Sequence, residues 1–323
     1  MIVIRTDANK NIATGHLMRC LAIANECHNL GTPVCFVFAD NESKDLLKKL
    51  SPHHENYEVK VLDTRYDDME AELDIITKFL SGKKTKTLLF DSYYVTPKYL
   101  SELKKYCNTS YCKTYYLDDL KAFEYPVDVV INYTDTPSYT PLREQFRDVD
   151  YTVRENVSDI LVTTGGTDDG NITGKVIEVI QSTLTGSVNI HAVIGVLNSF
   201  RDKLRILANE NPNIKLYENH PEMAELMKKC DVAISTAGTT LFELCAVGIP
   251  TICFPIADNQ IPGAKKLAGN EAVILMPEFD GQELADYLKE LTSDYNKRKS
   301  LSKTMRDLID GYGAKRIASL LCS

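Results

Sequence analysis

A histidine stands where a predicted helix begins. His16 ends the polar segment 7–16, which comes directly after the β-branched run 2–6. Unpaired N–H groups in the first turn of a helix carry a partial positive charge, so we expect His16 to stay neutral and able to accept a proton. Gly15 would let a ligand approach the backbone, and Arg19 shares the helix face three residues later. A histidine that only caps or packs is the alternative.

Two further segments join an apolar run to a helical pattern. In the first, 163–171, backbone N–H groups around Gly165, Gly166 and Thr167 could cluster around an anion. No Lys-Ser or Lys-Thr pair follows, so this segment is not a Walker loop. A glycine turn without a ligand is the alternative.

The second segment, 235–243, offers more groups to a ligand. Gly238, Thr239 and Thr240 would supply amides and hydroxyls for a phosphate at a helix N-terminus. Glu243 follows Thr239 by four residues, so it lies on the same helix face, where its carboxylate could accept both hydroxyls of a ribose. The combination suits a nucleoside diphosphate. Alternatively, Glu243 is a solvated charge stabilised by the helix dipole.

Other strand ends carry polar side chains as well. Asp91 and Tyr93 follow one apolar run, 117–120 ends another, and 258–260 follows a third. Each could equally be a strand-end turn or a helix cap. No spacing of His, Asp or Cys supports a metal, no G-x-S-x-G motif supports a serine hydrolase, and no cysteine has a recognisable nucleophile context. The sequence therefore predicts no metal and no cofactor.

The elements that position these residues alternate regularly between strand and helix. We predict strands at 2–6, 33–39, 57–62, 87–91, 114–117 and 127–131, with helices at 15–30, 42–50, 67–80 and 97–106. The pattern restarts with strands at 160–164, 189–194, 214–217, 232–235, 251–254 and 272–275, and with helices from 171, at 200–209, 221–229 and 240–247, and after 260. Such alternation implies parallel sheets with helices on both faces.

Between the two series, the polar stretch 132–157 has poor periodicity and reads as a connection. We therefore predict an α/β chain in which two Rossmann-like domains, 1–150 and 151–323, face each other across a cleft. In open parallel sheets, ligands bind at the carboxyl ends of the strands. The catalytic histidine would belong to the first domain and the nucleotide site to the second.

Composition narrows the class of protein. The 323 residues carry a net charge of −8, the wrong sign for wrapping nucleic acid or an anionic membrane. The nine cysteines are scattered through apolar stretches without a C-x-x-C pair, which indicates buried thiols in a reducing cytoplasm. No secretion leader and no run of 18 apolar residues is present, so a cytoplasmic protein is expected. The oligomeric state is left open.

Taken together, these motifs resemble those of one family, the UDP-sugar hydrolases of pseudaminic acid biosynthesis and spore coat polysaccharide protein G. The resemblance runs over most of the chain and keeps the order of the motifs. It rests on 15–16 with 19–22, 91–93, 117–120, Tyr139 with Leu142, Arg143 and Phe146, 165–168, 238–240 with Glu243, and 258–260. The family is related in fold to the MurG-type GT-B glycosyltransferases. One departure is that the family's Ile-Gly-x-Gly-His appears here with Ala13 in place of the first glycine.

The resemblance implies release of UDP from UDP-2,4-diacetamido-2,4,6-trideoxy-β-L-altropyranose without a metal. It makes His16, Tyr93 and Asn259 catalytic, and it is consistent with ligand contacts by Gly15, Arg19 and Gln260 and by the two glycine segments. Neutral His16 would activate a water opposite the departing diphosphate, inverting the anomeric configuration. A glycosyltransferase that uses the same donor, or a nucleotide-sugar-binding protein without catalysis, are the alternatives.

Overall fold

The computed structural model describes residues 1–168, 170–184, 188–195 and 198–323. The chain divides into two compact units. Unit 1 comprises Met1–Arg143 with Tyr312–Ser323, and unit 2 comprises Glu144–Gly311. Each unit has its own sheet and its own hydrophobic core.

Unit 1 is built on a parallel six-stranded sheet with the strand order β3-β2-β1-β4-β5-β6. The central strands β1 and β4 are buried at every residue, as expected for strands that helices cover on both faces. The strands are β1 (Ile2–Thr6), β2 (Val34–Phe38), β3 (Glu58–Val61), β4 (Thr87–Asp91), β5 (Lys113–Asp118) and β6 (Val129–Asn132).

Helices of unit 1 begin at residues suited to helix starts. The Asp40 carboxylate accepts the N–H of Ser43 at 2.8 Å, and the Thr96 hydroxyl accepts the N–H of Tyr99 at 3.1 Å, just before Pro97. The helices are α1 (Gly15–Asn29), α2 (Asn41–Leu50), α3 (Leu73–Ser81), α4 (Pro97–Thr109) and α12 (Gly313–Cys322), with 3₁₀ turns η1 (His54–Asn56), η2 (Glu70–Glu72) and η3 (Pro137–Tyr139).

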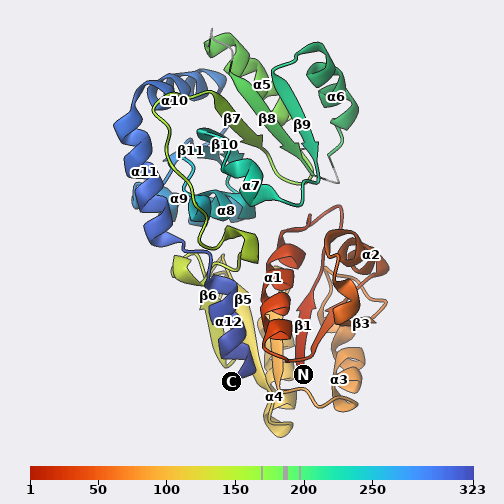
Figure 1. Cartoon of the computed structure of the whole chain (residues 1–323). Coiled ribbons are helices and arrows are strands. Elements are labelled where there is room, and N and C mark those ends of the chain that lie inside the picture. The colour runs from red at the N-terminus through yellow and green to blue at the C-terminus, as the bar shows by residue number, and fades with distance from the viewer. Residues whose placement is uncertain (169, 185–187, 196–197) are drawn as a thin grey trace. The chain divides into compact units, whose positions relative to one another are not determined.

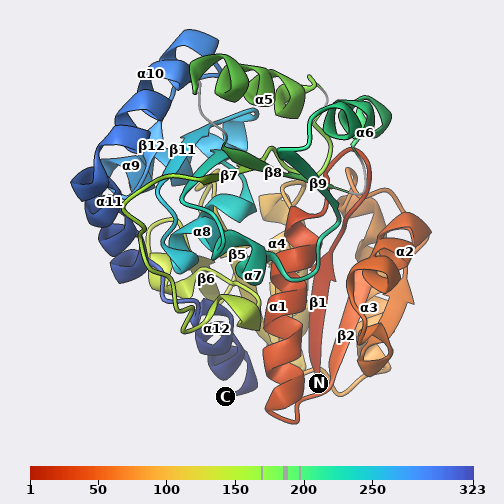
Figure 2. The same cartoon turned by 45° about the horizontal axis from the view of Figure 1, so that its top comes forward.

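Unit 2 repeats this plan. Its parallel strands stand in the order β12-β11-β10-β7-β8-β9, and α5 and α10 lie side by side (Figures 1 and 2). The strands are β7 (Asp159–Thr163), β8 (Asn189–Ile194), β9 (Ile214–Glu218), β10 (Val232–Thr236), β11 (Thr251–Phe254) and β12 (Ile274–Leu275). The helices are α5 (Ile172–Thr183), α6 (Arg201–Glu210), α7 (Met223–Met227), α8 (Thr239–Val247), α9 (Ile261–Gly269), α10 (Gly281–Ser293) and α11 (Tyr295–Leu308), with η4 (Glu144–Phe146) and η5 (Asp258–Gln260).

The strand order reverses at one point in each sheet. In unit 1, β1 lies between β2 and β4, and in unit 2, β7 lies between β8 and β10. Ligands of open α/β sheets bind at this point, at the carboxyl ends of the strands. The segments after β1 and β4 lead to His16 and Tyr93, and those after β7 and β10 are the two glycine segments.

The predicted alternation of strands and helices is confirmed, with a few shorter elements. Helix α3 begins at Leu73 instead of residue 67. Residues 65–67 form a turn in which Arg65 pairs with Asp67 at 2.8 Å, and the 3₁₀ turn η2 comes between this turn and α3. Helix α7 is limited to Met223–Met227, and β12 to Ile274–Leu275.

The contact division differs from the predicted domains 1–150 and 151–323. The boundary lies after residue 143, and the last twelve residues belong to unit 1. Helix α12 lies beside α1 (Figures 1 and 2). The carbonyl of Leu321 accepts the Thr87 hydroxyl at 2.9 Å, and the carbonyl of Leu320 accepts the Tyr115 hydroxyl at 3.1 Å. Periodicity reveals an amphipathic helix but not the sheet on which it packs.

Candidate active site

His16 lies in the first turn of α1, and its imidazole contacts the carboxyl end of β4. Nδ1 is 2.6 Å from Oδ1 of Asp91, the last residue of that strand. His16 is 6% exposed, and Asp91 is fully buried. Because a carboxylate only accepts hydrogen bonds, Nδ1 donates to Asp91, and Nε2 is the ring nitrogen left to exchange a proton with a ligand. A buried carboxylate that holds an imidazole in one tautomer is the arrangement a general base requires.

Arg19 lies on the same face of α1 as His16, as predicted. Its Nε donates to Asp91 Oδ2 at 2.7 Å, and its Nη2 donates to Asp91 Oδ1. Nη2 also approaches Nδ1 of His16 at 2.9 Å, but both nitrogens are donors, and Asp91 Oδ1 is their shared acceptor. The remaining nitrogen, Nη1, donates to Asp119 at 2.7 Å and to the Tyr133 hydroxyl. These buried contacts favour a positioning role for Arg19 over the direct ligand contact predicted from sequence.

Asp119 joins Tyr93 and Tyr133 to this group. The hydroxyls of both tyrosines donate to Asp119 Oδ2 at 2.7 Å. The Tyr93 ring stands edge-on to the imidazole of His16, with 4.3 Å between ring centroids. The structure therefore brings the predicted residues His16 and Tyr93 into contact at the carboxyl edge of the unit 1 sheet.

The two carboxylates stay charged in this buried cluster. Burial raises the pKa of Asp91, but the charge of Arg19 and the hydrogen bonds from Arg19 and His16 outweigh burial, so the pKa lies below its usual range. For Asp119, burial is likewise outweighed by Arg19 and by the Tyr133 hydroxyl, and the pKa is lowered. Burial, strengthened by the Asp119 charge, raises the pKa of Tyr133 well above its usual range despite the opposing charge of Arg19, so its hydroxyl stays a donor.

Asp91, Asp119 and Tyr133 are members of the cluster to which sequence reasoning gave no role. Asp91 and Asp119 stood among the polar strand ends, and Tyr133 follows β6 in the predicted connection. The available signal was the pair of aspartates that end neighbouring strands of a Rossmann-like sheet. Strand order alone would place Asp91 beside the β1 segment, because β4 neighbours β1.

The segment before His16 contains a strained residue. Ala13 has φ +57, in the left-handed region, at the position where the resembling family has its first glycine. Asn9 holds the turn, since its Oδ1 accepts the N–H groups of Asn11 and Ile12 at 2.9 and 3.1 Å. The backbone path that a glycine would favour is therefore kept without the glycine.

In unit 2, helix α8 begins at a residue without a side chain. Its N-cap is Gly238, which gives no side-chain cap, and its first turn has no acidic residue. Gly238, Thr239 and Thr240 are half-buried. The side chain of Gln260 lies next to Gly238. Its Nε2 atom is 3.7 Å from the position that a Cβ on this glycine would occupy. The N–H groups and positive dipole end of α8 suit an anion.

Helix α5 begins differently. Asp168 accepts the N–H of Ile172 at 2.6 Å and that of Thr173 at 3.3 Å, so a carboxylate caps the helix that follows the first glycine segment. A second anion at these amides would meet like charge. Asp169, within the predicted segment, lies outside the described residues. Contacts of a ligand with the half-buried Gly165, Gly166 and Thr167 stay a prediction.

The glycine pair has a structural reason of its own. Gly165 has φ +91, which favours glycine, and a Cβ on Gly195 would lie 2.5 Å from the Cα of Gly166. Two backbones thus pack closely at this point.

Two further predicted residues are half-buried. Glu243 lies on α8, one turn after Thr239, and Asn259 lies in η5.

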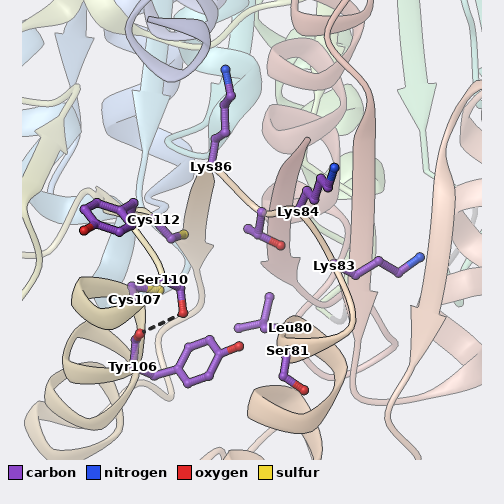
Figure 3. A pocket seen from close by; sticks show the side chains of 11 residues that line it. Leu80, Ser81, Lys83, Lys84, Lys86, Tyr106, Cys107, Ser110 and Cys112 are labelled. Atoms are coloured by element: carbon purple, nitrogen blue, oxygen red, sulfur yellow. Dashed lines mark hydrogen bonds between the residues drawn. The ribbon is translucent and has the colours of Figure 1, made fainter.

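A pocket of about 510 Å³ lies at the opposite edge of the unit 1 sheet (Figure 3). It surrounds the amino-terminal ends of β4 and β5, whereas His16 and Asp91 lie at the carboxyl ends. The pocket is lined by Leu80, Ser81, Lys83, Lys84, Thr85, Lys86, Tyr106, Cys107, Ser110, Tyr111 and Cys112. It is therefore separate from the candidate active site.

Within the described ranges, no three His, Cys, Asp or Glu side chains are grouped so that they could hold a metal ion. No described helix combines the length and apolarity needed to cross a membrane. All nine cysteines are unpaired by disulfides, and all but Cys322 are buried.

Comparison with known proteins finds one matching domain family and several relatives. Residues 160–318 match the glycosyltransferase family 28 C-terminal domain. The chain is 26% identical over 267 residues to the spore coat polysaccharide biosynthesis protein SpsG of Bacillus subtilis, covering 79% of this chain and 75% of that protein. A Helicobacter pylori protein named pseudaminic acid cytidylyltransferase and UDP-2,4-diacetamido-2,4,6-trideoxy-beta-L-altropyranose hydrolase is 28% identical over 231 residues, which cover 71% of this chain and 36% of that protein.

Solved structures give the fold. MurG of Acinetobacter baumannii superposes with a TM-score of 0.75 at 15% identity, covering 99% of both chains. Alr3699/HepE of Anabaena, solved with UDP-glucose, has a TM-score of 0.63 at 14% identity, covering 99% of this chain and 98% of that one. The chain therefore has the GT-B fold with two Rossmann-like domains, its residues 160–318 match the glycosyltransferase family 28 C-terminal domain, and its homologues include SpsG and the hydrolase-containing protein of H. pylori.

Proposed function

We propose that the chain is a UDP-sugar hydrolase that releases UDP from a UDP-linked 2,4-diacetamido-2,4,6-trideoxy sugar. The names of its relatives support an enzyme that uses UDP-sugars. The observation that carries the proposed base is the His16–Asp91 pair, in which a buried carboxylate 2.6 Å from Nδ1 leaves Nε2 as the nitrogen that could accept a proton.

The step begins with a water at the anomeric carbon. Its oxygen forms a bond to that carbon while its proton passes to Nε2 of His16. The bond from the anomeric carbon to the diphosphate breaks, and UDP leaves with the electron pair. Attack opposite the leaving group inverts the anomeric configuration. A positioned base of this kind contributes ~10²–10⁴-fold in rate.

The diphosphate is assigned to the N-terminus of α8. N–H groups of Thr239 and Thr240 aim fixed dipoles at the charge that develops on the leaving group. Glu243, one turn deeper, would accept the ribose hydroxyls, and Gln260 lies beside Gly238. Tyr93 and Asn259 are proposed to act on the sugar side of the substrate, as the resemblance implies.

The test measures UDP and free sugar in the absence of any acceptor. A panel of UDP-, GDP- and CDP-linked diacetamido sugars is incubated with the protein, and NMR follows nucleotide release and the first anomer formed. We expect release from the UDP-sugar with inversion, and a loss of ~10²–10⁴-fold in His16→Ala. A folded His16→Ala protein with the wild-type rate, or retention at the anomeric carbon, contradicts the mechanism.

Glycosyl transfer is the second candidate. It is favoured by the match of residues 160–318 to a glycosyltransferase domain and by the similarity to MurG-type transferases. The same base would then remove a proton from an acceptor hydroxyl. Turnover that requires an added hydroxyl acceptor, with no free sugar formed without it, would support transfer instead of hydrolysis.

A further inference from the structure

The two oxygens of the Asp119 carboxylate have very different surroundings. Oδ2 accepts three hydrogen bonds, from Arg19 Nη1 and from the hydroxyls of Tyr93 and Tyr133, each at 2.7 Å. Oδ1 is buried and accepts none from the described residues. The side chain as a whole is 9% exposed. One oxygen is therefore saturated, and the other is an acceptor without a donor.

An unpaired buried carboxylate oxygen calls for an explanation. Asp119 is charged, because Arg19 and the Tyr133 hydroxyl outweigh burial and lower its pKa. Buried acceptors are nearly always hydrogen-bonded, and the exceptions concentrate where a ligand or a water completes the set. Arg19, the nearest cation, is already engaged by Asp91 and by Oδ2. The missing donor must come from outside the cluster.

The position of Asp119 indicates what that donor is. Tyr93 links Asp119 to His16, since its hydroxyl binds Oδ2 and its ring lies 4.3 Å from the imidazole. A group that reaches Oδ1 is thus one side chain away from the proposed base. Among the parts of a nucleotide sugar, the sugar must lie nearest the base, and its acetamido N–H and hydroxyl groups are donors.

We propose that Asp119 Oδ1 accepts a hydrogen bond from an N–H or O–H group of the substrate's sugar, which makes Asp119 a specificity-determining residue. This inference rests on the proposed use of a nucleotide sugar, but not on hydrolysis. Because Oδ1 is closed to solvent, a side chain must shift to admit the donor. Tyr93 is the half-exposed member of an otherwise buried cluster, so its side chain is the one whose shift would admit the donor.

Asp119→Asn is an informative variant because the three donors at Oδ2 dictate its orientation. The amide oxygen must take the Oδ2 position, where it can still accept from Arg19 and the tyrosines. The amide NH₂ group then takes the Oδ1 position and presents a donor instead of an acceptor. The variant keeps size and shape, and it reverses hydrogen-bond polarity only at the proposed contact.

The experiment measures binding in a His16→Ala background, so that the substrate is not consumed. The ligands are UDP, the UDP-linked 2,4-diacetamido-2,4,6-trideoxy sugar, and three analogues in which hydrogen replaces the C2 acetamido, C4 acetamido or C3 hydroxyl group. We expect His16→Ala to lose about 10- to 100-fold in affinity for one analogue, which identifies the donor. In His16→Ala with Asp119→Asn, the parent sugar and that analogue should bind within about twofold of each other.

Tyr133→Phe is the matched control, because it removes a donor from Oδ2 and leaves Oδ1 untouched. In the His16→Ala background it should keep the discrimination between the parent sugar and the analogue. Three results would overturn the proposal. The first is that the double variant with Asp119→Asn still discriminates between the parent sugar and the analogue. The other two are that His16→Ala binds all three analogues as tightly as the parent sugar, or binds the parent sugar no more tightly than UDP. UDP affinity and the unfolding temperature show whether each variant is folded. Failure of hydrolysis would appear only in turnover, so the two proposals fail separately.

Discussion

Asp91→Asn tests how the buried carboxylate supports His16. Asp91 Oδ1 faces His16 Nδ1 and Arg19 Nη2, and Oδ2 faces Arg19 Nε and the thiol of Cys20. An asparagine of the same shape must point its NH₂ group at one of these two sets of donors. In either orientation an N–H group meets an N–H group of Arg19, and the negative charge that holds Nδ1–H is lost.

Two magnitudes follow from this geometry. Asp91 is fully buried and Arg19 is 4% exposed, so removing one partner of the pair should lower the free energy of unfolding by about 3–5 kcal/mol. For activity, Asp91 acts only through His16. Its removal can therefore cost no more than the ~10²–10⁴-fold that the base itself contributes.

A double-mutant cycle on kcat/KM separates this role from a general structural one. UDP release is measured for His16→Ala, Asp91→Asn and the double variant, at a temperature where circular dichroism shows that all are folded. The double variant should be no slower than His16→Ala, because there is no longer an imidazole to orient. If the two losses multiply instead, Asp91 does not act through His16 and the proposed pairing is refuted.

Asp7→Asn is the matched control for stability. Asp7 is 2% exposed and pairs with buried Arg5 at 2.5 Å, and among the described residues its hydrogen-bond partners are Arg5 and the N–H of Ala39. Its replacement should perturb the buried side chains of unit 1 without the loss in kcat, and Arg5 keeps its pair with Glu72. An equal loss in kcat in Asp7→Asn would indicate that damage to the unit, not loss of orientation, slows the reaction.

Four further predictions concern stability and nucleotide binding. Ala13→Gly should stabilise the protein by about 1 kcal/mol, measured by urea unfolding, because φ is +57 at this residue. The pKa of Asp91 is lowered in the folded state, so the ionised carboxylate stabilises the protein above the ordinary aspartate pKa of about 3.9, and this stabilisation is lost as the pH falls below that value. The difference in urea midpoint between wild type and Asp91→Asn should therefore shrink from pH 5 toward lower pH. Thr239→Asp should weaken UDP binding in calorimetry while raising the melting temperature, because a carboxylate would occupy and stabilise the α8 N-terminus. Gly313→Ala should destabilise the protein by about 1–3 kcal/mol or more, since the new Cβ would lie 2.0 Å from the carbonyl oxygen of Thr140, and unchanged urea unfolding would contradict the close approach.

Local spacing in the sequence determined much of this protein. Alternating strand and helix patterns are local properties of the chain, so they predicted two parallel sheets and the segments at their carboxyl ends. The three-residue spacing of His16 and Arg19 predicted a shared helix face, and the two side chains do meet there. Glycine segments after β7 and β10 were likewise readable, because glycines between an apolar run and a helical pattern mark a turn.

Only the tertiary structure decided which residues complete the site. Asp91 and Asp119 reach α1 from β4 and β5, and Arg19 joins them across 72 and 100 residues of chain. It also decided that Asp168 caps α5 while α8 begins at Gly238 without a side-chain cap, and that α12 packs in unit 1. These outcomes depend on strand order, on the local path of a turn and on burial between distant segments. Hydrophobic periodicity carries no information on any of the three, because it records the face of each element and not its neighbour.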